Sequence, residues 1–187
     1  MLNETWQTKH ECLWRSFVRL REVVEDTDTG EVIEARDALT RFCLDAFELR
    51  DWLRMSDGDP AVNEAVTKMF GKPASKPEKR VAGESVALAA CADIANASKH
   101  LELTQPSYSV GGPAEVTYEH MSSHRDIPDF ALPFIDDVPT FGEHQWMWII
   151  TGGGVEYDAL LLAEDAIRDW ERCLLSHGLL AKSEYFG

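Results

Sequence analysis

Three polar side chains with catalytic potential, Asp93, Asn96 and His100, are spaced three and four residues apart in the string CADIANASKHLEL. This spacing places them on one face of an α-helix, because adjacent turns bring such positions together. A histidine there can act as a general acid or base near neutral pH. The aspartate can fix the tautomer of the imidazole, and the asparagine can hold a substrate oxygen or phosphate. The alternative is a hydrogen-bond network between helices at the edge of the core.

The segment before this helix, GKPASKPEKR at residues 71–80, has two prolines and no apolar periodicity, so we interpret it as a mobile loop. Its cations are candidate binding groups for a phosphate-bearing substrate: Lys72, Lys76, Lys79 and Arg80. The alternative is that they only keep the loop solvated.

The net charge of the chain is -15, from 18 basic and 33 acidic residues. By region, residues 1–60 carry 8 basic and 14 acidic side chains (-6), residues 61–105 carry 6 and 5 (+1), and residues 106–187 carry 4 and 14 (-10). An extended contact with duplex nucleic acid requires a protein surface that neutralises many phosphates. The acidic regions 1–60 and 106–187 therefore exclude such a contact. A local phosphate site in the middle region stays open.

Apolar residues at helical spacing predict the elements that position these side chains. They indicate long helices over residues 6–24, 31–55 and 87–101, a short helix over 61–70, and a last long helix after Tyr157 that stops near Gly178. On the third long helix, the polar stripe is expected beside the apolar seam, at the edge of the core.

Residues 106–156 differ from the rest, with five prolines, glycine clusters and short aromatic or β-branched runs. We expect a small antiparallel sheet there, with strands at AEVTYEHM and QWMWII and a short return at Val155. The predicted fold class is α+β, mainly α: one domain over 1–187, with an antiparallel four-helix bundle from 1–105 and 157–187 and the β-rich insertion between them.

The pattern N-x-x-K-H at Asn96–His100, after an earlier helix containing R-D-W-L at Arg50, resembles the HEPN superfamily. That resemblance implies a helical bundle, often dimeric, and in many members a metal-independent ribonuclease of toxin-antitoxin or phage-defence systems. Its R-x4-6-H motif lies at the dimer interface, often with Asn after the Arg. Asn96 and His100 match the Asn and the His, whereas Ala95 stands at the Arg position. The candidate catalytic residues are His100, Asn96, Asp93, Lys99 and Arg50.

A formal R-x4-H pair also occurs in the last helix, at Arg172 and His177. Chance alone predicts about one such match in this chain. In an ideal helix the two side chains point well apart and His177 continues the apolar seam, so we rank this pair below the stripe.

No cofactor or metal is expected. His120, His124 and Asp126 follow a predicted strand and lack the glutamate of a helical zinc motif, so a polar loop is favoured. Trp146 and Trp148 could stack on bases, but a buried strand is favoured. The four cysteines are too far apart in the chain for a zinc or redox motif, and we expect them buried and reduced.

Three functions remain open. The first is a HEPN-like protein that binds or cleaves RNA or nucleotides without metal, acting as a homodimer in a bacterial defence or toxin-antitoxin system. The second is a non-catalytic acidic binding or inhibitor protein that contacts a protein partner. The third is a structural or immunity component whose helical bundle simply dimerises. The polar amino terminus and the absence of a long apolar run predict no membrane contact and a cytoplasmic location.

Overall fold

The computed structural model describes residues 5–25, 32–56, 58–74, 76, 79–99, 106–123, 144–152 and 155–181. Its helices are α1 (Trp6–Glu25), α2 (Val32–Ser56), α3 (Pro60–Phe70), α4 (Val86–Lys99) and α5 (Ala159–Ser176). All five predicted helices are therefore confirmed, with ends within a few residues of the expected positions. Two begin at aspartate N-caps: Asp59 accepts a hydrogen bond from Ala61 N at 2.8 Å, and Asp158 accepts one from Leu161 N at 2.9 Å.

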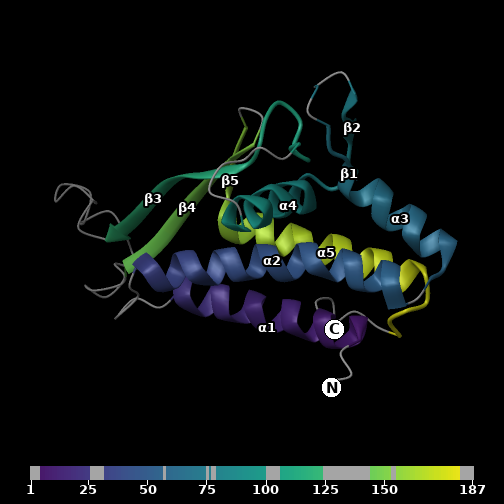
Figure 1. Ribbon diagram of the computed structural model, residues 1–187. Coiled ribbons are helices and arrows are strands. Elements are labelled where there is room, and N and C mark those ends of the chain that lie inside the picture. Colours follow the sequence, from purple (N-terminus) through teal and green to yellow (C-terminus); the bar gives the residue numbers. More distant parts are fainter. Residues whose placement is uncertain are drawn as a thin grey trace, which may run out of the picture.

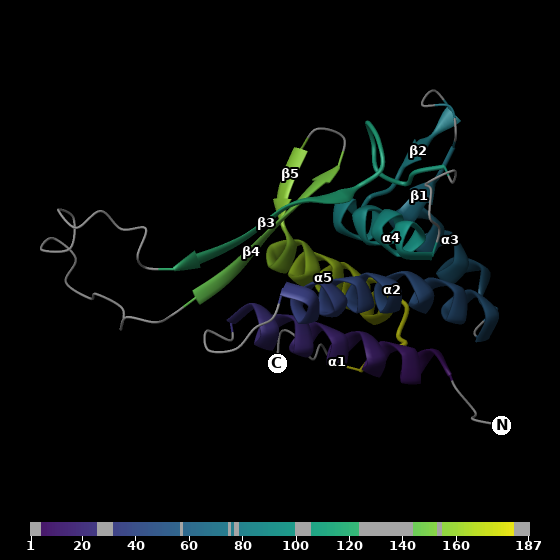
Figure 2. The ribbon, with the colours of Figure 1, turned by 60° about the vertical axis from the view of Figure 1, so that its left-hand side comes forward.

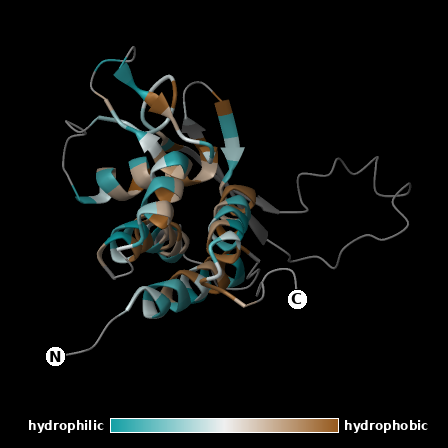
Figure 3. Ribbon diagram, turned by 90° about the vertical axis from the view of Figure 1, so that its right-hand side faces the viewer, coloured by the Kyte–Doolittle hydropathy of each residue, from teal (hydrophilic) through white to brown (hydrophobic). Residues whose placement is uncertain are grey.

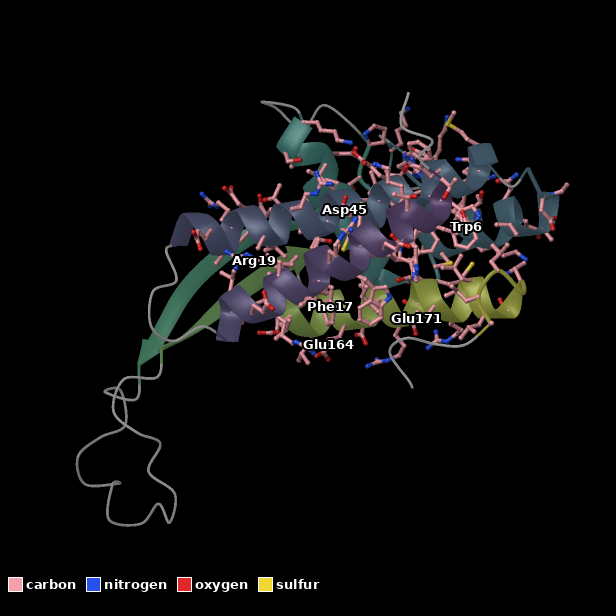
Figure 4. The ribbon with its side chains drawn as sticks, turned by 90° about the horizontal axis from the view of Figure 1, so that it is seen from below. Trp6, Phe17, Arg19, Asp45, Glu164 and Glu171 are labelled. Atoms are coloured by element: carbon pink, nitrogen blue, oxygen red, sulfur yellow. The ribbon has the colours of Figure 1, made fainter. Side chains whose placement is uncertain are left out.

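The long helices pack side by side (Figure 1), with α1 along α2 and α2 along α4. From below, α1 is seen to cross α2 and α5 (Figure 4). Brown and teal residues share each helix in Figure 3, as expected of helices with one apolar face. The indole of Trp170 on α5 is fully buried, and its Nε1 donates to the carbonyl of Ala46 on α2 at 3.0 Å. The described protein is thus mainly helical.

Helix α4 is buried on every side over Ala87 to Ala95, whereas Val86 and the last turn reach the surface. The sequence places the polar stripe at the edge of the core, but Asp93 is only 1% exposed. The reason is that residues 106–114, here called the 106–114 segment, fold back against this face of α4 and donate hydrogen bonds to Asp93.

The predicted sheet is present as three antiparallel strands, β3 (Glu115–Ser123), β4 (His144–Gly152) and β5 (Val155–Asp158), in the order β3-β4-β5. Figure 2 shows β3 and β4 extending together away from the helices. The ladder runs from Glu115↔Thr151 to Ser123↔His144, with an irregularity between Val116 and Tyr118. The short return at Val155 is confirmed and continues to Asp158, two residues past the expected end of the insertion.

A second sheet was not predicted. The first two residues of the predicted loop form β1 (Gly71–Lys72), which pairs with β2 (Val81–Ala82) just after the loop. Gly71 ends α3 with φ 75°, and a Cβ placed there would lie 2.2 Å from the carbonyl oxygen of Val81. Glycine therefore permits both the turn and the close approach of the strands. Two-residue strands carry too little periodicity to be recognised from sequence.

The cysteines all lie on helices, as predicted. Cys43, Cys91 and Cys173 are buried as expected, whereas Cys12 is only half-buried, so the expectation of burial is wrong for it. A hydrogen bond with the Cys91 thiol, together with burial, raises the pKa of the Cys43 thiol. In the described ranges, no helix is both long and apolar enough to span a membrane.

Candidate functional site

Asp93 binds the backbone of the 106–114 segment. Its Oδ1 accepts a hydrogen bond from Tyr108 N at 2.6 Å, and its Oδ2 accepts from Ser109 N at 3.0 Å and Ala114 N at 3.1 Å. Three backbone donors therefore share one carboxylate that is almost fully buried. This arrangement holds the segment that leads from α4 into the sheet.

Arg50 reaches the same segment from α2. Its Nη1 donates to the hydroxyl of Tyr108 at 2.5 Å, and its Nε donates to Asp51 at 3.0 Å. The guanidinium carbon lies 4.0 Å from the ring centroid of Phe47 and 5.6 Å from that of Phe70. The side chain of Arg50 is 15% exposed, so its cation is enclosed by aromatic rings and held by polar partners.

The remaining stripe residues lie towards the end of α4. Asn96 is half-buried and Lys99 is exposed. Lys99 Nζ lies 3.7 Å from Glu48 Oε1, and Lys9 on α1 lies 3.7 Å from the other oxygen of the same carboxylate. His100, the proposed acid or base, lies outside the described residues. The structure thus brings Asp93 and Arg50 together at Tyr108 and places Lys99 in an ion-pair network with Glu48.

The four cations of residues 71–80 have different environments. Lys72 lies in β1, and Lys76 and Lys79 are exposed. Arg80 donates from Nη1 to the carbonyl oxygen of Ser109 at 2.7 Å, so it too supports the 106–114 segment. Lys72, Lys76 and Lys79 are therefore the solvent-facing members of the predicted basic group.

Arg172 and His177 line one cleft of about 460 Å³, here called the α3–α5 cleft. The cleft lies between α3, the residues just before α4, and the last turns of α5. The sequence predicts that these two side chains point apart in an ideal helix, and both of them line this one cleft. Helix α5 ends at Ser176, and His177 is its C-cap with φ -103° and ψ 9°, while its backbone N–H still donates to the carbonyl oxygen of Cys173.

The geometry of His177 determines its tautomer. Nδ1 lies 2.9 Å from the carbonyl oxygen of Cys173 and 3.0 Å from Ser176 Oγ. A carbonyl only accepts hydrogen bonds, so Nδ1 of the neutral ring carries the hydrogen and Nε2 carries the lone pair. No hydrogen bond from the described residues engages Nε2. The imidazole is therefore arranged to accept a proton at Nε2.

Ion pairs flank this histidine. Lys68 pairs with Glu64 at 2.9 Å, an interaction that lowers the pKa of the Glu64 carboxyl and raises the pKa of the Lys68 ammonium. Arg172 pairs with Asp169 at 2.8 Å. Each ion pair joins residues three or four positions apart on its own helix, Lys68–Glu64 on α3 and Arg172–Asp169 on α5. The two cations are largely exposed, so a stronger anion can compete with the carboxylates for them. Burial raises the pKa of the Cys173 thiol to about 11, so this lining residue stays neutral.

A second hollow adjoins the α3–α5 cleft and includes Lys72 of the predicted basic group. The two hollows share Glu64, Lys68 and Glu84. Their combined lining holds the cations Lys68, Lys72 and Arg172 and the carboxylates Glu64, Glu84 and Asp169, three of each. This is a neutral zone in a chain of net charge -15.

From sequence, Arg172 and His177 rank below the α4 stripe, and Lys68 and Ser176, which also line the α3–α5 cleft, are not among the candidates. The available signal was the formal R-x4-H spacing beside Gly178, since a glycine just after a helix marks the point where side-chain directions change.

In the part of the chain that the structure describes, no group of three or more His, Cys, Asp or Glu side chains is arranged to hold a metal ion. His120 lies in β3, while His124 and Asp126 lie outside the described residues. Trp146 and Trp148 lie in β4, with side chains outside the description.

Comparisons of the chain with models of protein families, with curated proteins and with solved structures found no match.

Proposed function

We propose that this protein is a HEPN-like RNA- or nucleotide-binding protein that cleaves RNA without metal, as part of a bacterial defence or toxin-antitoxin system. In this proposal the long helices α1, α2, α4 and α5 form an antiparallel four-helix bundle, and two copies associate as a homodimer. The supporting observation is the α3–α5 cleft, where Arg172 and His177 form an R-x4-H pair and Nε2 of the histidine is available as a proton acceptor.

The chemistry follows from these groups. His177 Nε2 takes the proton of an RNA 2′-hydroxyl, and the 2′-oxygen attacks the adjacent phosphorus. Arg172 and Lys68 stabilise the negative charge that develops on the phosphoryl oxygens. The bond to the 5′-oxygen breaks, and that oxygen receives a proton from an acid supplied by the second copy. The products are a 2′,3′-cyclic phosphate and a 5′-hydroxyl, so no metal-bound water is required.

The α4 stripe offers a rival location for the same activity. There His100 would be the acid or base, Asn96 and Lys99 would contact the phosphate, and Asp93 and Arg50 would position the helix and the 106–114 segment. The buried hydrogen bonds of Asp93 and Arg50 are consistent with such a positioning role. The two locations differ in their histidine, which makes them separable by experiment.

The test is cleavage of a fluorescently labelled single-stranded RNA in the presence of EDTA. If His177 is the base, His177→Ala lowers the rate by about 10²–10⁴-fold, whereas His100→Ala leaves it near wild type. The reverse pattern assigns the activity to the α4 stripe. Arg172→Ala is expected to slow cleavage by at least tenfold. Arg168→Ala is its matched control, because Arg168 makes the same three-residue ion pair on α5, with Asp165, and does not line the cleft.

Background-level activity of the wild type, equal to that of both histidine variants, would refute the ribonuclease proposal. Sedimentation velocity tests the proposed dimer, and a monomer at tens of micromolar would contradict it.

One observation favours the second candidate, an acidic non-catalytic binding protein. Ala95, which stands at the Arg position of the family motif, is fully buried, so the α4 motif cannot present a cation from that position. In that case the acidic residues of 106–187 would contact a basic protein partner. Charge reversal in this region should then abolish capture of that partner at low salt, and an unchanged interaction would refute the idea.

A further inference from the structure

A third hollow, lined by three arginines, lies between α1 and α2, away from the α3–α5 cleft. It has a volume of about 330 Å³, near the lower end of ligand-sized pockets. Three arginines line it, Arg15 and Arg19 on successive turns of α1 and Arg41 on α2. We propose that this hollow, here called the arginine groove, is a binding site for a phosphate-bearing anion.

The first step of the argument is the charge of the lining. Asp45 is the one carboxylate among the residues that line the groove, and it is 2% exposed. Arg41 neutralises the Asp45 carboxylate through a bidentate contact, with Nε 3.0 Å from Oδ2 and an Nη 2.9 Å from Oδ1. With that pair cancelled, Arg15 and Arg19 leave the groove at +2. Such a positive site is unusual on a chain of net charge -15.

The second step concerns what holds these two arginines at present. The guanidinium of Arg15 donates to Cys12 Sγ at 3.2 Å, which is a weak acceptor. Arg19 touches Glu34 through one 3.3 Å contact between two side chains that are 58% and 57% exposed. An exposed single contact of this kind is worth little, so an oxoanion can displace it. Most guanidinium donors of both residues are therefore available to a ligand.

The third step is geometric. Arg15 and Arg19 are four residues apart, so their side chains leave α1 on the same face, and both line the groove together with Arg41 across it. Figure 4 shows Arg19 on α1 and Asp45 on α2 where the two helices lie beside each other. The planar guanidinium groups of Arg15 and Arg19, on successive turns of α1, suit the tetrahedral oxygens of phosphate, which they can bind through paired hydrogen bonds, while Arg41 stays engaged with Asp45. Ser16 also lines the groove, but its hydroxyl donates to the carbonyl oxygen of Leu13 at 2.9 Å, so the arginines are the donors for an anion.

The shared chemistry is the phosphoryl group, whether it belongs to a small anion or to an RNA backbone. The arginine groove lies on α1 and α2, whereas the α3–α5 cleft is built from α3 and α5, so this site does not depend on the proposed ribonuclease activity.

The test is calorimetric titration of the full chain at low salt with three probes: inorganic pyrophosphate, adenosine monophosphate and a ten-nucleotide RNA. The double variant Arg15→Gln/Arg19→Gln should weaken binding of at least one probe by tenfold or more. The matched control is Arg54→Gln/Arg36→Gln, which removes the same charge from α2 at positions that do not line the groove.

Loss confined to pyrophosphate or the mononucleotide indicates a small-anion site, and loss confined to the RNA indicates a backbone contact; either supports the proposal. Equal weakening in the control pair would show non-specific attraction and overturn it. Absence of binding by the wild type to all three probes would also overturn it. Circular dichroism of each variant checks that the helices remain intact.

Discussion

Asp93 offers the sharpest test of how the 106–114 segment is held. In Asp93→Asn, the amide can keep its oxygen towards Ser109 N and Ala114 N, the two donors that share Oδ2. The NH2 group of the asparagine must then face Tyr108 N, which is itself a donor. In the wild type, Tyr108 N donates to Oδ1 of Asp93 at 2.6 Å. A charge-assisted hydrogen bond is worth about 1.5–3 kcal/mol, so we expect the asparagine variant to lose about 2–3 kcal/mol of unfolding free energy.

Asp93→Ala removes all three acceptor contacts and leaves three buried N–H groups unpaired, so its expected loss is larger, about 4 kcal/mol or more. That is a large part of the roughly 5–15 kcal/mol that stabilises a typical domain. Urea unfolding followed by circular dichroism measures these losses, and hydrogen exchange should show faster exchange at Tyr108, Ser109 and Ala114. Asp165→Asn, which alters an exposed ion pair on α5, serves as control and should change stability by less than about 0.5 kcal/mol.

The reasoning fails if Asp93→Asn unfolds at the same urea concentration as the control variant. If its stability is unchanged while RNA cleavage is lost, Asp93 acts in chemistry and not as the anchor of the segment.

Three further perturbations test separate contacts. Arg50→Ala should lower the unfolding free energy by about 2–3 kcal/mol, because it removes the hydrogen bond to Tyr108 and the contacts with aromatic rings; a loss below about 0.5 kcal/mol in urea unfolding would contradict this. The pKa of Cys173 is raised from 9.0 to about 11, so at pH 8 its thiolate fraction is about 100-fold below that of an ordinary thiol, and iodoacetamide should modify it correspondingly slowly in mass spectrometry. Because the pKa of the Cys173 thiol is raised in the folded protein, the contribution of this thiol to stability should be present below pH 9 and lost as the pH rises through about 11. Iodoacetamide labelling of Cys173 as fast as in the unfolded protein would refute the raised pKa, and with it both predictions. Gly71→Ala should destabilise the β1–β2 pairing, since its Cβ would meet the carbonyl oxygen of Val81; a loss of less than about 1 kcal/mol on unfolding would show that the strands separate easily.

Sequence patterns were sufficient to predict the helices, because apolar residues recur every three or four positions along each long helix. They also identified β3 and β4, whose aromatic and β-branched runs stand between turn residues. They could not identify β1 and β2, because two-residue strands form through the close approach permitted at Gly71 and not through a side-chain pattern.

The candidate site was harder to predict, because its details depend on contacts between distant segments. Spacing placed Asp93 on the same face as Asn96, but the covering of that face by the 106–114 segment depends on backbone donors 15 to 21 residues further along the chain. For Arg172 and His177, spacing compares directions within one helix and could not show that α3 and the residues before α4 form a cleft beside both side chains. Periodicity predicts which side chains share a face of a helix or strand. It does not predict which loop packs against that face or at which residue the helix ends.

The 106–114 segment has a consequence for limited proteolysis. Its tip holds Val110, which is 64% exposed, followed by Gly111 and Gly112, a composition that usually marks a preferred cleavage site. A protease must draw a stretch of chain into an extended form, and here Ser109 and Ala114, on either side of the tip, are both bonded to Asp93. Cutting therefore requires those bonds to open first, so a broad-specificity protease should spare this tip while the native protein persists. Residues 106–114 would then survive a digest as one piece, attached to the β3 strand that follows them.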